Sequence, residues 1–112
     1  MASSTLGATL APYLTEREMQ DAIRTAALRY GWAFYHTHDS RRSDGGFPDC
    51  VCVKDGRVLV FELKRQRGRV GAKQQAWIDQ FASVPNCTAA IVRPIPKEGE
   101  MSYDDALELL AD

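Results

Sequence analysis

The pattern of apolar and polar residues divides the chain into segments of helical and of strand character. Apolar residues at positions 19, 22, 23, 26, 27 and 30 follow the three- and four-residue spacing of an amphipathic helix. Thr15 and Glu18 fit a capping box at the start of this helix, and Gly31 fits its end. Further helices are predicted from about residue 71 to residue 83 and from Ser102 to Leu110.

Strand patterns lie between these helices. The aromatic-rich segment 32–38 and the short apolar segment 88–93 each predict one strand. Two apolar runs flank Asp55-Gly56, a pair that favours the two-residue type I′ turn of a β-hairpin. Both faces of this hairpin are apolar, so helices are expected on both sides of the sheet. The predicted fold is a three-layer α/β/α sandwich with the order α-β-β-β-α-β-α.

The predicted hairpin carries charged residues at the ends of its apolar strands. If Asp55 and Gly56 form the turn, the register sets Asp49 opposite Glu62. Lys64 shares the face of Glu62, because side chains alternate along a strand. A bulge or a longer turn would shift this pairing, and charged strand ends can also simply reach solvent.

Two carboxylates placed directly opposite each other repel and destabilise a hairpin. Lys64 can offset part of that repulsion. A divalent cation offsets it more fully, since Mg²⁺ takes one or two carboxylates and keeps several waters. The hairpin end is therefore a candidate metal site.

Length and charge refine this picture. A chain of 112 residues suits one domain, predicted at residues 15–112 after a flexible tail at 1–14. The formal net charge is −1, yet residues 41–73 hold nine Lys or Arg against four Asp or Glu. The remaining residues hold five Lys or Arg against eleven Asp or Glu. A basic middle third fits either a nucleic-acid contact surface or an ordinary solvated basic face.

The cysteines and the N-terminus bear on location. Three cysteines and no recognisable secretory leader favour free thiols in a reducing compartment. Cys50 and Cys52 are expected to be small core residues rather than part of a zinc site, which needs four ligands. No apolar run reaches membrane-spanning length, so no membrane association is expected. The expected location is the cytoplasm of a bacterial cell or of a phage-infected host.

The charged residues stand in an order that resembles the PD-(D/E)XK nuclease signature. Pro48-Asp49 is followed, after twelve residues, by Glu62-Leu63-Lys64. More narrowly, the chain is similar to the VRR-NUC family, including its small stand-alone viral and bacterial members, over roughly residues 15–110. The residues that carry this resemblance are Glu18-Met19-Gln20, Gly46-Phe47-Pro48-Asp49, Glu62-Leu63-Lys64, Gly68-Arg69, Gln74 and Trp77.

The resemblance implies a restriction-endonuclease-like core and a role for each matching residue. Asp49 and Glu62 would bind Mg²⁺, with Mn²⁺ as a substitute, and the Leu63 backbone carbonyl would be a further ligand. Lys64 would assist the attack on phosphate. A helix glutamate completes the site in many relatives, which implies Glu18, although helix capping explains that residue equally well. A glutamine in the following helix matches Gln74, which also begins an otherwise apolar stripe.

Several basic residues are expected to contact the phosphate backbone, which positions a substrate without reading its sequence. Arg93 lies in Val92-Arg93-Pro94, which matches a Val-Arg-Arg element of the family but keeps only its first arginine, and is expected to orient groups near the site or to contact phosphate. His36 and His38 share a strand face and fit a phosphate contact, a packed pair or a metal pair. The other expected backbone contacts are Arg41, Arg42, Arg65, Arg67, Arg69 and Lys73.

These features together predict a Mg²⁺-dependent DNA endonuclease. No base-reading motif is present, so structure-selective cleavage is expected rather than cleavage of a specific sequence. The resemblance implies branched, junction or flap DNA as the substrate. A homodimer is expected, because two active sites are needed to cut two strands symmetrically. The alternatives are a non-catalytic nucleic-acid-binding module of the same fold and a nuclease that acts on RNA.

Overall fold

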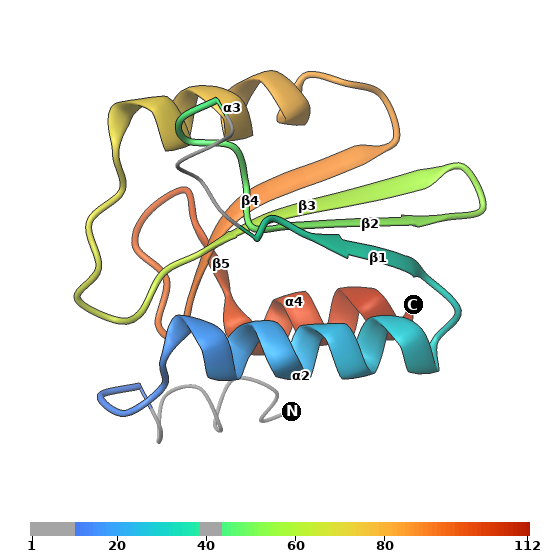
Figure 1. The fold of residues 1–112 in the computed structure, drawn as a ribbon, viewed down its shortest axis with the longest axis horizontal. Helices are drawn as coiled ribbons and strands as arrows, with labels where there is room; N and C mark the ends of the chain where they lie inside the picture. Colours follow the sequence, from blue (N-terminus) through green and yellow to red (C-terminus); the bar gives the residue numbers. More distant parts are fainter. Residues whose placement is uncertain (1–10, 39–43) are drawn as a thin grey trace.

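The computed structural model describes residues 11–38 and 44–112 and shows a mixed α/β fold (Figure 1). Within these residues, three helices and five strands run α-β-β-β-α-β-β-α, which differs from the predicted order by one short strand before the last helix. That strand spans two residues, which is too short to leave a periodic pattern in the sequence. The elements are α2 (Glu16–Arg29), β1 (Ala33–His36), β2 (Cys50–Lys54), β3 (Arg57–Leu63), α3 (Ala72–Ala82), β4 (Cys87–Arg93), β5 (Met101–Ser102) and α4 (Tyr103–Ala111).

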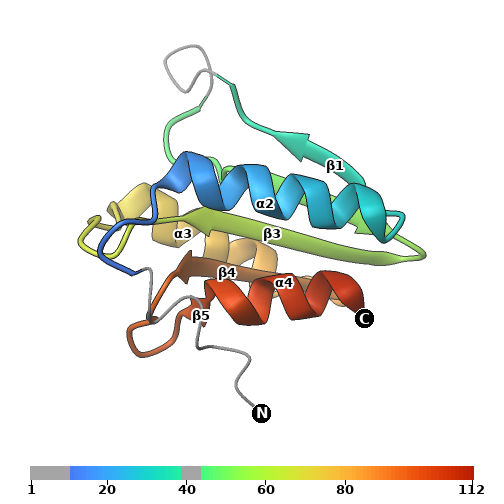
Figure 2. The ribbon, with the colours of Figure 1, turned by 90° about the horizontal axis from the view of Figure 1, so that it is seen from below.

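The five strands form one sheet in the order β1-β2-β3-β4-β5. The first three strands pair antiparallel, whereas β4 pairs parallel with β3 and with β5. A parallel neighbour requires a crossover, and α3 provides it between β3 and β4. Figure 1 shows α3 on one side of the sheet and α2 and α4 side by side on the other, an arrangement that Figure 2 shows from below.

The β2–β3 hairpin has the predicted turn and the predicted register. Asp55 and Gly56 take positive φ angles of 49° and 79°, as a type I′ turn requires. The paired strand residues run from Lys54↔Arg57 at the turn to Cys50↔Phe61 at the far end. One step beyond that last pair, the same register brings Asp49 and Glu62 together.

Each face of the sheet packs against its own apolar cluster, because side chains alternate between the faces. The cluster beneath α2 and α4 contains Phe61 and Leu59 of the central strand, and Cys50 and Cys52 are fully buried in it. This confirms the expected core role of the two cysteines. Burial raises the pKa of the Cys52 thiol to about 11, which keeps it protonated near neutral pH. The cluster beneath α3 is centred on Val60, Ile78 and Ile91.

Helix caps hold the ends of α2 and α4 where the sequence predicted them. Thr15 and Glu18 form a complete capping box, in which each side chain accepts a backbone N–H of the other residue. Ser102 caps α4 by accepting the N–H of Asp105. Part of the predicted tail, residues 1–10, lies outside the described residues, and Ala11 is buried. None of the described helices combines the length and the apolar character that crossing a membrane requires.

Candidate active site

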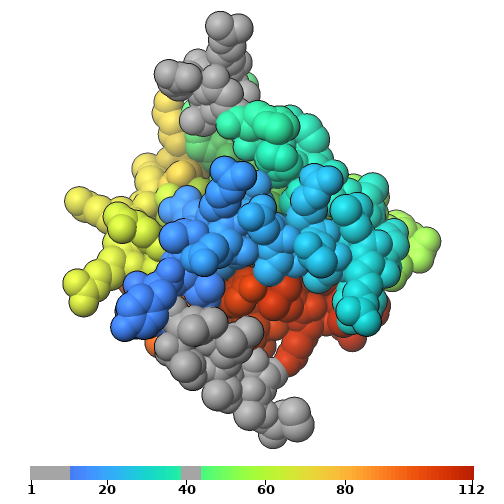
Figure 3. Space-filling view, turned by 60° about the horizontal axis from the view of Figure 1, so that its bottom comes forward, coloured from blue at the N-terminus to red at the C-terminus, as the bar shows by residue number. Residues whose placement is uncertain are grey.

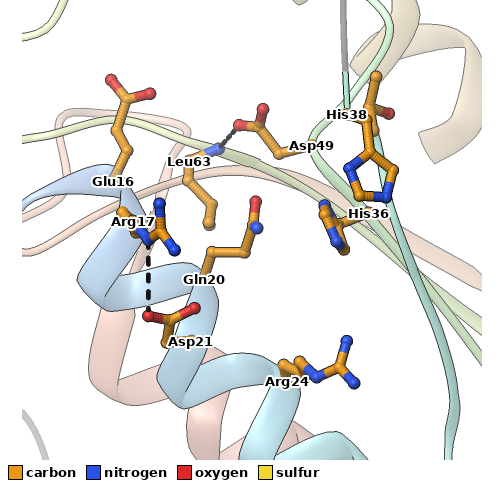
Figure 4. A pocket seen from close by; sticks show the side chains of 10 residues that line it. Glu16, Arg17, Gln20, Asp21, Arg24, His36, His38, Asp49 and Leu63 are labelled. Carbon is orange, nitrogen blue, oxygen red and sulfur yellow. Dashed lines mark hydrogen bonds and ion pairs between the residues drawn. The ribbon is translucent and has the colours of Figure 1, made fainter.

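The two carboxylates of the predicted site meet at the end of the hairpin. Asp49 directly precedes β2, and Glu62 is the penultimate residue of β3. The Asp49 side chain accepts a hydrogen bond of 2.8 Å from the backbone N–H of Leu63 (Figure 4). That bond fixes the carboxylate of Asp49 against the end of the central strand, beside Glu62.

Pro48 shapes the same strand end. Continuing the register by two residues sets Pro48 opposite Leu63, and proline has no N–H to donate. The Leu63 carbonyl therefore receives no ladder bond from Pro48 and remains a candidate ligand. Thr37 holds the incoming chain from the β1 side, through bonds of 2.9 Å from its hydroxyl to the Pro48 carbonyl and from its N–H to the Asp49 carbonyl.

Glu62 and Lys64 are buried charged residues at the end of the central strand. Glu62 is 3% exposed and Lys64 is 8% exposed, and the Lys64 Nζ lies 3.6 Å from the Glu62 Oε2. The other carboxylate oxygen of Glu62, Oε1, is buried and makes no hydrogen bond. A buried oxygen without a partner is costly, so this atom is a natural position for a bound group.

The electrostatics of the site favour a cation. Burial, reinforced by the negative charges of Asp49 and Glu16, raises the pKa of Glu62 to about 8, although Lys64 acts in the opposite direction. Burial also raises the pKa of Asp49, against the opposing hydrogen bond from Leu63. Two adjoining carboxyl groups of this kind hold a proton near neutral pH unless a positive charge replaces it.

The donors present fit a divalent metal ion that keeps part of its water shell. Within residues 11–38 and 44–112, no three His, Cys, Asp or Glu side chains come together to hold a metal. The protein therefore offers two carboxylates, Asp49 and Glu62, with the Leu63 carbonyl beside them. Mg²⁺ is commonly held by one or two carboxylates and several waters, so a small protein donor set suits it.

A cavity of about 620 Å³ opens in front of Asp49 and Leu63, between α2 and β1. Figure 4 shows Gln20 pointing from α2 toward Asp49, with Glu16 one turn earlier on the same helix. Glu16 and Gln20 are four residues apart and lie on one ridge of α2, beside the buried ridge of Met19 and Ile23.

Glu16, which was not predicted from the sequence, lines the cavity, and Glu18 takes the capping role that was one of its two expected roles. The Glu18 carboxylate bonds the Thr15 backbone in the capping box, and Glu18 does not line the cavity. Glu16 lines it and acts electrostatically on both Asp49 and Glu62. The sequence signal was available: position 16 precedes Gln20 by one helical turn, whereas the capping box already occupies position 18.

Comparison with known protein families gives one match. The model of the VRR-NUC domain matches residues 9–94, which includes every predicted site residue. The chain belongs to the VRR-NUC family. A VRR-NUC domain indicates a nuclease of the PD-(D/E)XK type, a class that typically uses divalent metals. Comparison with curated proteins and with solved structures found no match.

Gln74 of the VRR-NUC domain caps a helix in this structure. Its side-chain oxygen accepts the backbone N–H of Gly71 at 2.8 Å, at the start of α3. Gln74 is half-buried and does not line the cavity at Asp49. Helix capping thus accounts for a polar residue at this position, and a role of Gln74 in the active site stays a prediction.

Arg93, in the shortened Val-Arg-Arg element, does not reach the surface where it was expected to contact phosphate. It is 1% exposed, and its Nε and Nη2 donate to the two carboxylate oxygens of Glu100 at 2.8 and 3.0 Å. Its Nη1 donates to the carbonyls of Arg65, Gln66 and Gly68 at 2.7–3.2 Å. Arg93 therefore clamps the loop that follows Lys64, and the phosphate contact expected of it does not fit this burial.

The remaining basic residues keep an exposed position. Arg65, Arg67, Arg69 and Lys73 all lie on the surface, in the loop and helix that follow the Lys64 strand end. Arg65 and Arg67 line a groove together with Tyr13. The predicted contacts at Arg41 and Arg42 lie outside the described residues.

Proposed function

We propose that this VRR-NUC protein is a Mg²⁺-dependent DNA endonuclease whose active site is formed by Asp49, Glu62 and Lys64. One observation carries the proposal: Glu62 is buried, its Oε1 has no hydrogen-bond partner, and both a second carboxylate and a lysine adjoin it. We further propose that the fold is the three-layer, restriction-endonuclease-like core expected for such enzymes, formed by residues 15–112.

In this proposal the two carboxylates and the Leu63 carbonyl hold Mg²⁺, or Mn²⁺ in its place. When bound, the ion neutralises charge on the phosphate and lowers the pKa of a water. The N–H of Leu63 bonds one oxygen of Asp49, and the other oxygen of the same carboxylate would hold the ion. Glu16 is a better candidate than Glu18 for further support, because Glu16 lines the cavity and Glu18 caps the helix.

Lys64 acts on the reacting phosphate. Its ammonium group carries three N–H donors and lies beside Glu62, where it can orient the attacking water. The same donors stabilise negative charge as it develops on the phosphate oxygens. Because Lys64 is almost fully buried, its charge is poorly screened by solvent and acts strongly at short range.

The expected substrate is branched, junction or flap DNA, cut by a homodimer in the cytoplasm. The exposed residues Arg65, Arg67, Arg69 and Lys73 suit phosphate contacts, which position DNA of any sequence. Two copies of the site would be needed to cut two strands symmetrically.

A substrate panel tests this function. Purified protein is incubated with junction, flap, linear duplex and single-stranded DNA and with the matching RNA, in Mg²⁺ or EDTA, beside the Lys64→Ala variant. We expect cleavage of a branched DNA that requires Mg²⁺ and is lost in the variant. Cleavage that survives in Lys64→Ala would remove that residue from the mechanism. Binding without cleavage would favour a non-catalytic module, and preferential cutting of RNA would favour an RNA nuclease.

A further inference from the structure

The cavity in front of Asp49 extends beyond the carboxylates and changes its charge. At the Asp49 end, Glu16 and Asp49 supply negative charge. His36 and His38, on and after β1, line the cavity beside Asp49, because Thr37 between them bonds the Asp49 carbonyl. Arg24 on α2 lies farther along the cavity, as Figure 4 shows, and Arg17 and Asp21, which pair with each other, also line it. In Figure 3, α2 crosses the middle of this side of the molecule, next to β1. The hollow between these two elements thus continues from the carboxylates, past two imidazoles, to the Arg24 guanidinium.

Arg24, His36 and His38 line this part of the cavity, and the Phe34 ring lies next to them without lining it. Phe34 and His36 face α2 because residues alternate along β1, and their ring centres are 6.2 Å apart. The ring centres of His36 and His38 are 4.2 Å apart. The Arg24 guanidinium lies 6.0 Å above the Phe34 ring, which places this arginine across the edge strand. The row of rings leads along β1 toward Asp49.

Arg24 has no acidic partner in the described part of the chain. No carboxylate there lies within 4.0 Å of its guanidinium, whereas Arg17, two turns earlier, pairs with Asp21 at 4.0 Å. An arginine without a carboxylate partner, next to two imidazoles that offer ring N–H donors, provides a donor set for an anion. The described residues also bring no third His, Cys, Asp or Glu to this histidine pair, as a metal site would require.

We propose that Arg24, His36 and His38 form a second phosphate-binding subsite, which holds the phosphodiester next to the one being cut. The proposal rests on the nuclease function proposed above. A strand whose scissile phosphate lies at Asp49 and Glu62 must continue in some direction. The cavity directs it along β1, where guanidinium and imidazole donors replace the carboxylates. The subsite holds the sugar-phosphate backbone and is therefore independent of base sequence.

A subsite for a neighbouring phosphate affects only substrates that have one. Thymidine 5′-(p-nitrophenyl phosphate) contains a single phosphodiester, so its hydrolysis needs the metal site and Lys64 but not this subsite. Efficient cleavage of longer DNA needs the catalytic residues and this subsite together. The test compares these two substrates in the Arg24→Gln and His36→Gln variants. The matched control is Arg29→Gln, an exposed arginine of the same helix that lines a different groove beside α4.

We expect Arg24→Gln to lower kcat/KM for DNA about 10- to 100-fold, as the loss of a charged hydrogen bond implies. The effect of His36→Gln should be smaller, and both variants should hydrolyse the thymidine ester at the wild-type rate. The slope of log Kd against log salt should fall by about 0.7–0.9 in Arg24→Gln, the change for one lost phosphate contact. Arg29→Gln should match the wild type in every measurement.

An equal loss on both substrates in Arg24→Gln would overturn the subsite, because that residue would then act on the reaction itself. Unchanged DNA cleavage and an unchanged salt slope in both variants would overturn it as well. If the wild type hydrolyses neither substrate, the proposed nuclease function fails. The salt dependence of DNA binding in EDTA still decides the subsite in that case: a lower slope in Arg24→Gln supports it, and a wild-type slope refutes it.

Discussion

Replacing Arg93 by alanine should destabilise the protein far more than replacing an exposed arginine. Arg93 is 1% exposed, and its guanidinium donates five hydrogen bonds of 2.7–3.2 Å, two to Glu100 and three to the loop after Lys64. Its loss leaves the Glu100 carboxylate, whose side chain is 12% exposed, without its counter-charge. It also leaves three backbone carbonyls without a side-chain donor.

Breaking a buried ion pair by removing one partner costs about 3–5 kcal/mol. A domain of this size is stable by about 5–15 kcal/mol, so the change removes a large share of the free energy of unfolding. Glu100→Gln keeps a hydrogen-bond acceptor and loses only the charge, so its cost should be smaller. Arg17→Ala removes an ion pair whose side chains are 89% and 67% exposed, and should cost about 1 kcal/mol or less.

Urea denaturation followed by circular dichroism measures all three variants. The slope of the free energy of unfolding against urea concentration should be the same in all variants, so that differences in the urea midpoint report differences in stability. Hydrogen exchange adds a local measurement, because the Gly68 N–H bonds the Arg65 carbonyl inside the clamped loop and should exchange faster in Arg93→Ala. A cost for Arg93→Ala no larger than that of Arg17→Ala would refute the clamp and reopen a surface role for this arginine.

Three further predictions follow from the site. Folding raises the pKa of Glu62 from 4.5 to about 8, so between these pH values the folded protein binds more protons than the unfolded chain. Denaturation titrations of the metal-free protein should therefore show the free energy of unfolding falling as pH rises from 4.5 to 8, and Glu62→Gln should flatten this pH dependence. Gly46→Ala should lower the free energy of unfolding more than Gly99→Ala in the same denaturation assay. Both glycines have φ above +80°, but a Cβ added at position 46 would lie 2.7 Å from the Lys73 backbone, whereas a Cβ at position 99 would have no atom within 4 Å. Glu16→Gln should weaken metal-dependent cleavage while Glu18→Gln, which keeps the capping box, should not; the opposite ranking would restore Glu18 as the ligand.

The hairpin and the helices follow from local chemistry, which is why the sequence predicts them well. Asp55-Gly56 sets both the turn and the register, and the register alone brings Asp49 to Glu62. The Thr15–Glu18 capping box likewise fixes where α2 begins. In each case, residues within a few positions of one another determine the outcome.

Features that depend on distant contacts were not predictable in the same way. The surroundings of Arg93 are set by Glu100 and by a loop more than twenty residues earlier, so nothing near Arg93 in the sequence indicated a buried clamp. The two-residue strand β5 exists through its parallel pairing with β4 and carries no pattern of its own. The capping box at Glu18 was a local signal in favour of Glu16, but that Glu16 faces the cavity is set by the packing of α2 against the sheet.

That Asp49 and Glu62 hold a catalytic cation is tested most directly by the cleavage rate of Asp49→Asn as a function of Mg²⁺ concentration. The Asn oxygen can still accept the Leu63 N–H, so the variant should keep its fold and its circular dichroism spectrum. We predict that Mg²⁺-dependent cleavage falls by more than about 100-fold. Replacing a residue that only hydrogen-bonds a metal ligand costs up to about 100-fold, and replacing the ligand itself should cost more. A folded Asp49→Asn protein that cuts DNA at the wild-type rate and with the wild-type Mg²⁺ dependence would contradict the assignment.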